Sequence, residues 1–362
     1  MRSWSNMGTS PARPTQSNAS RMTPFERIKA VCRGELPDRV PLVLLLREFA
    51  LKYAGVRFSE AYSDPDTYVR AQLKVLQDFR LDAVCDLFVT PAVDEALGAK
   101  IVFPDDDPPW IPEPSVTTAA DLEKFVSLDP LSQGRMPYLL DIVTRLKREV
   151  GPDIPVMAWP SVPFRTACML RGSQDLYRGF YRDPEFISDL IEACYEPCLA
   201  YGKALIDAGA DIIFTSNPTA STGCISREHY ETYAHATTRD MHRALKSHGA
   251  EIIIFHPCGQ WHDRLDLLVE LEADVLHFDK VEIQSFKSEF AERCVYMGNV
   301  RTVDTLLSGT VRGVEIETQN CLEKGADGGR YILSADCIVP RDTDPAHLHA
   351  MADAIERHGS YS

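Results

Sequence analysis

The sequence predicts an α/β protein folded as a single (β/α)8 barrel of the TIM type, with an N-terminal extension and an inserted proline-rich loop. Short β-rich runs alternate with helical patterns along most of the 362 residues. Eight such pairs favour a closed parallel barrel over an open sheet. A barrel of this type occupies roughly 200 to 400 residues as one domain. We therefore expect one barrel domain over residues 22–362, although length alone would also allow two domains.

Eight runs are expected to form the strands, because they are rich in β-branched and other apolar residues and lie between turn residues. In chain order they are Val40–Leu46, Ala83–Phe88, Val156–Ser161, Asp211–Asn217, Glu251–His256, Val275–Asp279, Val295–Val300 and Tyr331–Asp336.

Helices are expected between most of these strands. The first begins at Thr23, where Thr23-Pro24-Phe25-Glu26 combines an N-cap, a proline at the first helical position and a capping-box glutamate; Gly34 ends it. Further helical patterns cover Asp64–Arg80, Pro184–Ala208 and Ser226–Ser247.

Two segments do not follow the alternation. Residues 1–21 contain polar residues, prolines, three arginines and no acid, which predicts a disordered tail. A targeting segment, or translation from an upstream start with Met22 as the true beginning, would also explain this composition. The stretch Ala99–Leu131 contains Asp105–Asp107 followed by four closely spaced prolines over Pro108–Pro114, so we expect an inserted loop near the barrel mouth.

Composition excludes several classes of protein. With 53 acidic residues against 38 lysines and arginines, the net charge of −15 argues against a nucleic-acid partner. No apolar run approaches the ~18 residues of a membrane span. Ten cysteines in a chain of this length do not make a disulfide scaffold, so we expect a reducing cytoplasm. There, a cysteine beside a histidine is a candidate metal ligand or nucleophile.

The strongest chemical motif follows the fifth predicted strand. Ile252–Phe255 runs directly into His256, and Cys258 lies two residues further on; the eighth strand delivers Cys337 in the same way. Active sites of such barrels lie at the carboxyl ends of the strands. One imidazole and two thiolates suit a catalytic zinc with an open fourth position. The alternative is that these cysteines are small buried apolar residues.

Several further motifs resemble one known superfamily, that of uroporphyrinogen decarboxylase-like proteins, over Thr23–His358. The segments that carry the resemblance are Leu97-Gly98 with Val102–Pro104, Val162–Gly172, Gly209–Asp211 with Pro218–Ser221, Gly298–Val300, Leu306–Thr310 and Cys337–Pro340. The resemblance implies a β/α barrel.

Within that superfamily, His256, Cys258 and Cys337 match the zinc ligands of the corrinoid-linked methyltransferases, of which the methylcobamide:coenzyme M enzymes are one type. This resemblance implies a zinc ion, a corrinoid such as methylcobalamin carried on a partner protein, and methyl transfer to or from a small molecule. Asn217 departs from the aspartate of the thiol-methylating pattern, and an amide cannot act as a general base. The substrate is therefore left open between a thiol acceptor and a methylated or methoxylated donor.

Two other functions remain alternatives at this stage. One is decarboxylation without a metal, and the other is a non-catalytic role as a partner of a corrinoid protein. The direction of transfer and the oligomeric state are also left open.

Other strand exits supply further candidate site residues. Asn217 and Asp279 are candidate catalytic residues, and Asp279 is expected to orient His256. Candidate substrate-binding residues are Arg47, Glu95, Trp159 and Asn299, with Arg165 as a second cation for an anionic group. A docking surface for the corrinoid partner is expected around Trp159, Asn217, Trp261 and the Pro104–Pro114 loop.

Overall fold

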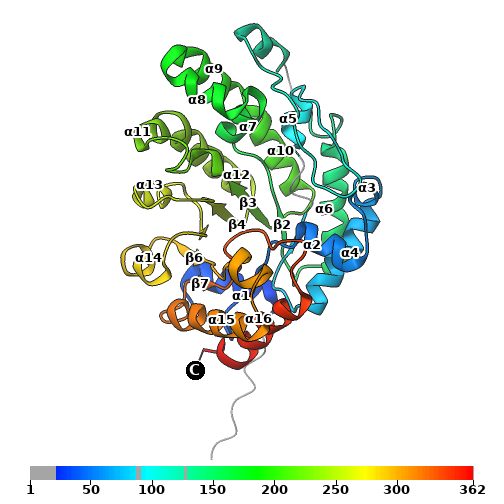
Figure 1. The fold of residues 1–362 in the computed structure, drawn as a ribbon, viewed down its shortest axis with the longest axis vertical. Coiled ribbons are helices and arrows are strands. Elements are labelled where there is room, and N and C mark those ends of the chain that lie inside the picture. Colours follow the sequence, from blue (N-terminus) through cyan, green and yellow to red (C-terminus); the bar gives the residue numbers. More distant parts are fainter. Residues whose placement is uncertain (1–21, 87–90, 126–128, 362) are drawn as a thin grey trace, which may run out of the picture.

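A parallel sheet curls through the centre of the molecule, with helices around its outside (Figure 1). The computed structural model describes residues 22–86, 91–125 and 129–361. Seven strands follow one another in sequence order: β1 (Val84–Cys85), β2 (Val156–Ala158), β3 (Ile212–Ser216), β4 (Ile252–His256), β5 (Val275–His277), β6 (Val295–Met297) and β7 (Tyr331–Ile332). Each lies beside the strands that precede and follow it in the chain, so all their carboxyl ends meet at one edge of the sheet.

The first of the eight predicted strands, Val40–Leu46, is not a strand in the structure. Leu42 forms only an isolated parallel bridge to Leu333. Pro41 has no N–H to donate, which prevents a continuous ladder. The segment nevertheless bonds to both edges of the sheet: Val43 N donates to Leu333 O, and Asp82 N, two residues before β1, donates to Leu42 O.

Aspartates placed just before several strands fix the register at the opposite edge. Each accepts a hydrogen bond from a main-chain N–H on the preceding segment: Asp82 from Leu42 at 2.6 Å, Asp211 from Val156 at 2.9 Å and Asp274 from Ile253 at 2.8 Å. A slip by one residue would break these bonds and exchange the side chains that face the two sides of the sheet.

The helices follow the predicted pattern with two differences. They are α1 (Pro24–Arg33), α2 (Arg47–Ala54), α3 (Phe58–Ala61), α4 (Pro65–Asp78), α5 (Ala92–Ala96), α6 (Met136–Val150), α7 (Pro163–Arg171), α8 (Ser173–Arg182), α9 (Pro184–Ala193), α10 (Tyr195–Asp207), α11 (Arg227–Tyr230), α12 (Ala236–His248), α13 (Leu265–Leu268), α14 (Ile283–Phe290), α15 (Val311–Gly325) and α16 (Pro345–His358). Short 3-10 turns cover Ala119–Lys124 and Pro218–Ala220, and π-helical turns cover Glu231–His235 and Thr302–Leu307.

The differences lie in the two long patterns. Pro184–Ala208 forms two helices, α9 and α10, because Pro197 is tolerated only in the first turn of a new helix. Ser226–Ser247 is helical throughout, but a π turn separates α11 from α12. The start of α1 confirms the predicted capping box, in which Thr23 and Glu26 exchange hydrogen bonds.

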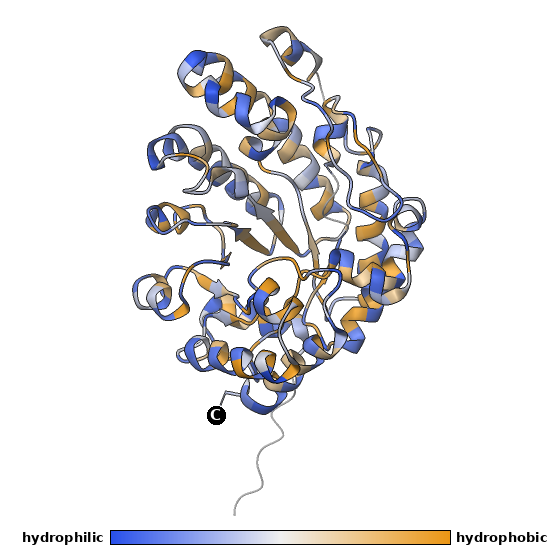
Figure 2. Ribbon diagram, in the orientation of Figure 1, coloured by the Kyte–Doolittle hydropathy of each residue, from blue (hydrophilic) through white to orange (hydrophobic). Residues whose placement is uncertain are grey.

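Two apolar cores lie on the two faces of the sheet. Alternate strand residues such as Ile213 and Ile253 pack against the helices, while Ile212 and Ile252 belong to an inner core to which every strand contributes. Figure 2 shows apolar residues on the strands and on the helix faces turned toward them. Val43 and Leu45 join the inner core as well, so segment 40–46 alternates between the two faces as the strands do.

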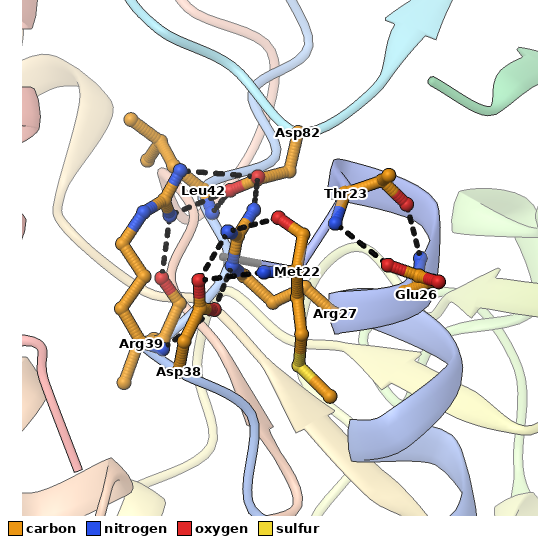
Figure 3. Close-up of polar contacts among 9 residues, drawn as sticks. Met22, Thr23, Glu26, Arg27, Asp38, Arg39, Leu42 and Asp82 are labelled. Carbon is orange, nitrogen blue, oxygen red and sulfur yellow. Dashed lines mark hydrogen bonds and ion pairs between the residues drawn. The ribbon is translucent and has the colours of Figure 1, made fainter. Parts of the chain in front are cut away.

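Helix α1 closes the end of the inner core that lies at the amino ends of the strands. Phe25, Ile28 and Val31 are buried in that core. Beside them, Arg27 bonds to Asp38 and to the fully buried Asp82, which also accepts hydrogen bonds from Arg39 (Figure 3). Paired charges in this setting stabilise the attachment of α1 to the start of the sheet.

The inserted segment Ala99–Leu131 has little regular structure in its described part. Val102 pairs with Trp110 in an isolated antiparallel bridge, and the main chain of Ser115 and Val116 donates to Leu170 O at the end of α7. Asp107 pairs with Arg341. No helix in the described ranges is long and apolar enough to cross a membrane.

Candidate metal site and adjoining cavity

His256, Cys258 and Cys337 come together at the carboxyl ends of the strands. His256 is the last residue of β4, Cys258 follows it, and Cys337 lies beyond β7. The Sγ atoms of Cys258 and Cys337 are 3.9 Å apart, and Cys337 Sγ lies 3.5 Å from His256 Nε2. All three potential ligand atoms lie within 4.8 Å of one another. The curled sheet therefore assembles residues that are about 80 positions apart.

These separations fit a tetrahedral zinc ion. Zinc bonds of ~2.3 Å to sulfur and ~2.0 Å to nitrogen place two thiolates about 3.8 Å apart and a thiolate and an imidazole about 3.5 Å apart. The observed distances of 3.9 and 3.5 Å agree with both. The donor set also suits zinc and leaves the fourth position to a substrate.

Main-chain hydrogen bonding orients the ring of His256. Its Nδ1 donates to the carbonyl oxygen of His277 at 2.8 Å, because a carbonyl can only accept. This fixes the tautomer in which Nε2 carries the lone pair and faces Cys337. The expected role of Asp279 is wrong here: a backbone carbonyl, not the Asp279 carboxylate, bonds to His256.

Asp279 instead supports the loop that carries Cys258. Its Oδ2 accepts the N–H of Gly259 at 2.9 Å and lies 4.0 Å from Cys258 Sγ. Gly259 has a φ of +98°, which disfavours a side chain there. Trp261 donates its indole N–H to Cys258 O, so the turn is held from both sides.

Electrostatics in the triad separate the two thiols. The pKa of Cys337 is lowered, because Cys258 donates a hydrogen bond to it and His256 lies beside it. The hydrogen bond to Cys337, together with burial, raises the pKa of Cys258. Burial lowers the pKa of His256, but the hydrogen bond and charge of Cys337 outweigh burial and raise it overall. The chain thus stabilises a thiolate at Cys337 even before a cation is considered.

A cavity of about 160 Å³ adjoins His256 inside the carboxyl end of the sheet. Its walls combine apolar side chains with two arginines, and none of the described residues that line it carries a carboxylate: Leu45, Arg47, Trp159, Arg165, Phe214, Ser216, Pro218, His256 and Ile338. Three predicted residues, Arg47, Trp159 and Arg165, are therefore brought to the metal ligands. In a protein of net charge −15, two cations in a small cavity favour an anionic ligand.

Arg165 has a partner that sequence reasoning missed. Its Nη1 lies 3.8 Å from Asp94 Oδ2 and donates to Ser161 Oγ at 3.1 Å, and its guanidinium lies 4.6 Å from the Trp159 ring centre. Asp94 is fully buried, and burial raises its pKa to about 6. In the sequence, the only sign of Asp94 is that it precedes Glu95, which was a predicted site residue.

Glu95 and Asn299 lie away from this cavity. Glu95 accepts the N–H of Arg135 at the start of α6, at 3.1 Å. Asn299 donates to Val281 O and lines a different cavity of about 500 Å³, together with Asp279 and α15.

Asn217 and Trp261 are fully buried, which corrects the expected docking surface. Asn217 accepts a hydrogen bond from Thr219, and its Nδ2 has no partner among the described residues. Trp261 packs edge-on against Tyr230 and Phe255. Neither side chain can contribute to an exposed surface for a partner protein.

Comparison with known sequences points to one family and two activities. The sequence profile of uroporphyrinogen decarboxylase (URO-D) matches residues 23–358. Methylcobamide:CoM methyltransferase MtbA of Methanosarcina mazei is 26% identical over 341 residues, covering 93% of this chain and 98% of the relative. Uroporphyrinogen decarboxylase of Saccharophagus degradans is 24% identical over 305 residues, covering 81% and 83%.

The fold is also found in a solved structure. A methyltransferase from Methanosarcina mazei superposes with a TM-score of 0.85 at 21% identity, covering 93% of this chain and 99% of the other.

Proposed function

The chain belongs to the uroporphyrinogen decarboxylase (URO-D) family, and within this family we propose that it is a zinc-dependent methyltransferase that exchanges a methyl group between a corrinoid on a partner protein and a small substrate. Its relatives are enzymes, both methyltransferases and decarboxylases. The observation that carries the proposal is the triad of His256, Cys258 and Cys337, at separations that suit one zinc ion. We place the protein in the cytoplasm. We also assign its fold to the (β/α)8 barrels, with segment 40–46 completing the ring of eight between β7 and β1.

The residues around the triad divide the work. Zinc held by the three side chains supplies a Lewis acid that lowers the pKa of a thiol or polarises the leaving group of a methyl donor. Asp279 and Trp261 hold the Cys258 turn in place. Arg47 and Arg165 bind an anionic group of the substrate, and Trp159 supports the Arg165 guanidinium.

The size of the cavity decides what enters it. About 160 Å³ admits a small thiol, ether or amine but not a corrin macrocycle. A corrinoid would therefore have to be held by its carrier protein outside the cavity, where it would supply or accept the methyl group. Asn217 has a buried amide nitrogen without a partner among the described residues and precedes Pro218 of the cavity wall, but it does not itself line the cavity.

The test is methyl transfer by the purified, zinc-loaded protein. Methylcobalamin is mixed with candidate thiols, and cob(I)alamin with candidate methyl ethers and amines, while the methyl–cobalt absorbance is followed. Loss of that absorbance with a thiol supports methylation of thiols, and its appearance with a methyl donor supports demethylation. Protein stripped of zinc is the control and should be inactive in both.

Decarboxylation remains the second candidate because curated decarboxylases of the family are similar over most of the chain. It is favoured if the protein contains no zinc and converts uroporphyrinogen. If no zinc-dependent methyl transfer occurs even with a cognate corrinoid protein, and no decarboxylation occurs, the non-catalytic partner role is left.

A further inference from the structure

His277 is bonded to both strand exits that carry the metal ligands. It is the last residue of β5 and is fully buried. Its carbonyl oxygen accepts the Nδ1–H of His256 at 2.8 Å. Its ring donates from Nε2 to Ala335 O, also at 2.8 Å, and Ala335 precedes Cys337 by two residues. The ring centroids of His256 and His277 lie 4.4 Å apart and stack at 29°.

We propose that His277 is a positioning residue of the metal site, which fixes the exit of β7 relative to His256 and thereby sets the separation of the ligands. The inference rests on the proposed function, since it concerns the zinc site invoked there.

The need for such a residue follows from the topology. β4 and β7 are not neighbours in the sheet; β5 and β6 lie between them. Within the sheet, the ladder therefore connects His256 to Cys337 through three successive strand pairs, β4–β5, β5–β6 and β6–β7. Hydrogen bonds from His277 connect the two directly, and bonds that orient ligands typically change metal affinity 10- to 100-fold.

The ring of His277 does more than fill space. An apolar ring would stack on His256 and contact Phe214 equally well. Burying the imidazole costs free energy, because its Nδ1 has no hydrogen-bond partner among the described residues. The bond to Ala335 is what the imidazole provides and a phenyl ring would not.

The experiment compares His277→Phe with His277→Gln. Phenylalanine keeps a ring but removes the donor, while the side-chain amide of glutamine can replace it at Nε2. The main-chain carbonyl that holds His256 is unchanged in both. The matched control is His242→Phe, because His242 is also fully buried and bonded through both nitrogens, to Thr215 and Leu271, but lies on α12 outside the sheet.

Zinc affinity is measured by competition with a chromogenic chelator, and cobalt(II) replaces zinc for the absorption spectrum of the thiolate–metal bands. We expect His277→Phe to weaken zinc binding about 10- to 100-fold and to change the cobalt spectrum. His277→Gln should recover most of the affinity, and His242→Phe should lower the melting temperature without changing either metal readout.

Unchanged zinc affinity and an unchanged cobalt spectrum in a folded His277→Phe protein would overturn the inference. If His277→Phe does not fold, His277→Leu, which also lacks the donor, is compared with His277→Gln: weaker zinc binding in the leucine variant alone supports the role of the donor, and equal affinity in the two variants rejects it. Failure of the parent protein to bind zinc would instead reject the proposed function itself.

Discussion

The carboxylate of Asp94 lies 3.8 Å from Nη1 of Arg165, and neither of its oxygens accepts a side-chain hydrogen bond from a described residue. The pair therefore balances charge without using the guanidinium donors. Apart from the bond to Ser161, those donors remain for a ligand in the cavity. The structure thus keeps the Arg165 cation buried in the wall of the cavity while leaving it able to bind an anion.

The first prediction concerns this cation. Arg165→Gln should weaken binding of 3-mercaptopropionate to the zinc-loaded protein about 10-fold to 100-fold, because a hydrogen bond to a charged group is lost. Binding of uncharged 2-mercaptoethanol should change little. Calorimetric titration measures both. Arg171→Gln is the control, since Arg171 is on the same helix but donates to the carbonyls of Val116 and Thr117. Equal losses for both thiols would count against an anion-binding role.

The second prediction is that Cys258→Ser loses most of the bound zinc. Serine is a weaker ligand for zinc than a thiolate, and two protein ligands then remain. The fold should survive, because a barrel of this size has a large core of its own. Elemental analysis and the melting temperature check both points. Cys224→Ser, at an exposed cysteine after β3, should retain full zinc content.

The third prediction uses pH. Burial raises the pKa of Asp86 to about 7, and Asp86 accepts the N–H of Trp159. In the unfolded chain the same carboxyl ionises near pH 4. The folded state therefore holds the proton up to a higher pH, and stability from this group falls as pH rises from about 4 to about 7.

Asp86→Asn keeps the acceptor and removes the ionisation. The free energy of unfolding of this variant, relative to the parent, should rise between pH 5 and pH 8 by an amount on the order of 2 kcal/mol. Urea unfolding at both pH values measures it. A difference that does not depend on pH would show that Asp86 is ionised in the folded protein across this range.

The fourth prediction tests the network below the sheet. Asp82→Ala should destabilise the protein by about 3–5 kcal/mol, because Arg27 is left buried with part of its charge uncompensated. Asp342→Ala removes the exposed partner of Lys52 and should cost about 1 kcal/mol or less. Chemical unfolding of the two variants side by side gives the comparison. Similar losses would mean that burial of the Asp82 network contributes nothing special.

Seven of the eight predicted strands and the predicted start of α1 are confirmed, because their signals are local. Apolar runs between turn residues and the capping box at Thr23 need only neighbouring residues. Segment 40–46 was misassigned because its apolar pattern resembles a strand, and Pro41 interrupts the ladder. An apolar pattern takes no account of the N–H group that Pro41 lacks.

The site was predictable where one motif carries it and not where distant backbone does. His256 and Cys258 share one strand exit, but the carbonyl oxygens of His277 and Ala335 have no sequence signature. The prediction that Glu95 lies at the site failed for another reason. On the short helix α5, adjacent residues face different surroundings, and only packing shows which one reaches Arg165.

Helix α1 has a consequence for the order of events during turnover. Phe25, Ile28 and Val31 close one end of the inner core. In the described part of the chain, a ligand therefore reaches the cavity from the opposite end. Under the proposed function, the substrate and the carrier protein would then share one entrance. A carrier docked at this entrance would trap a small molecule that is already bound in the cavity and would delay the entry of one that is still in solution. The small molecule should therefore bind before the carrier, and an excess of carrier should slow exchange of the small molecule. This is an ordered binding mechanism, in contrast to the random order that two independent entrances would allow.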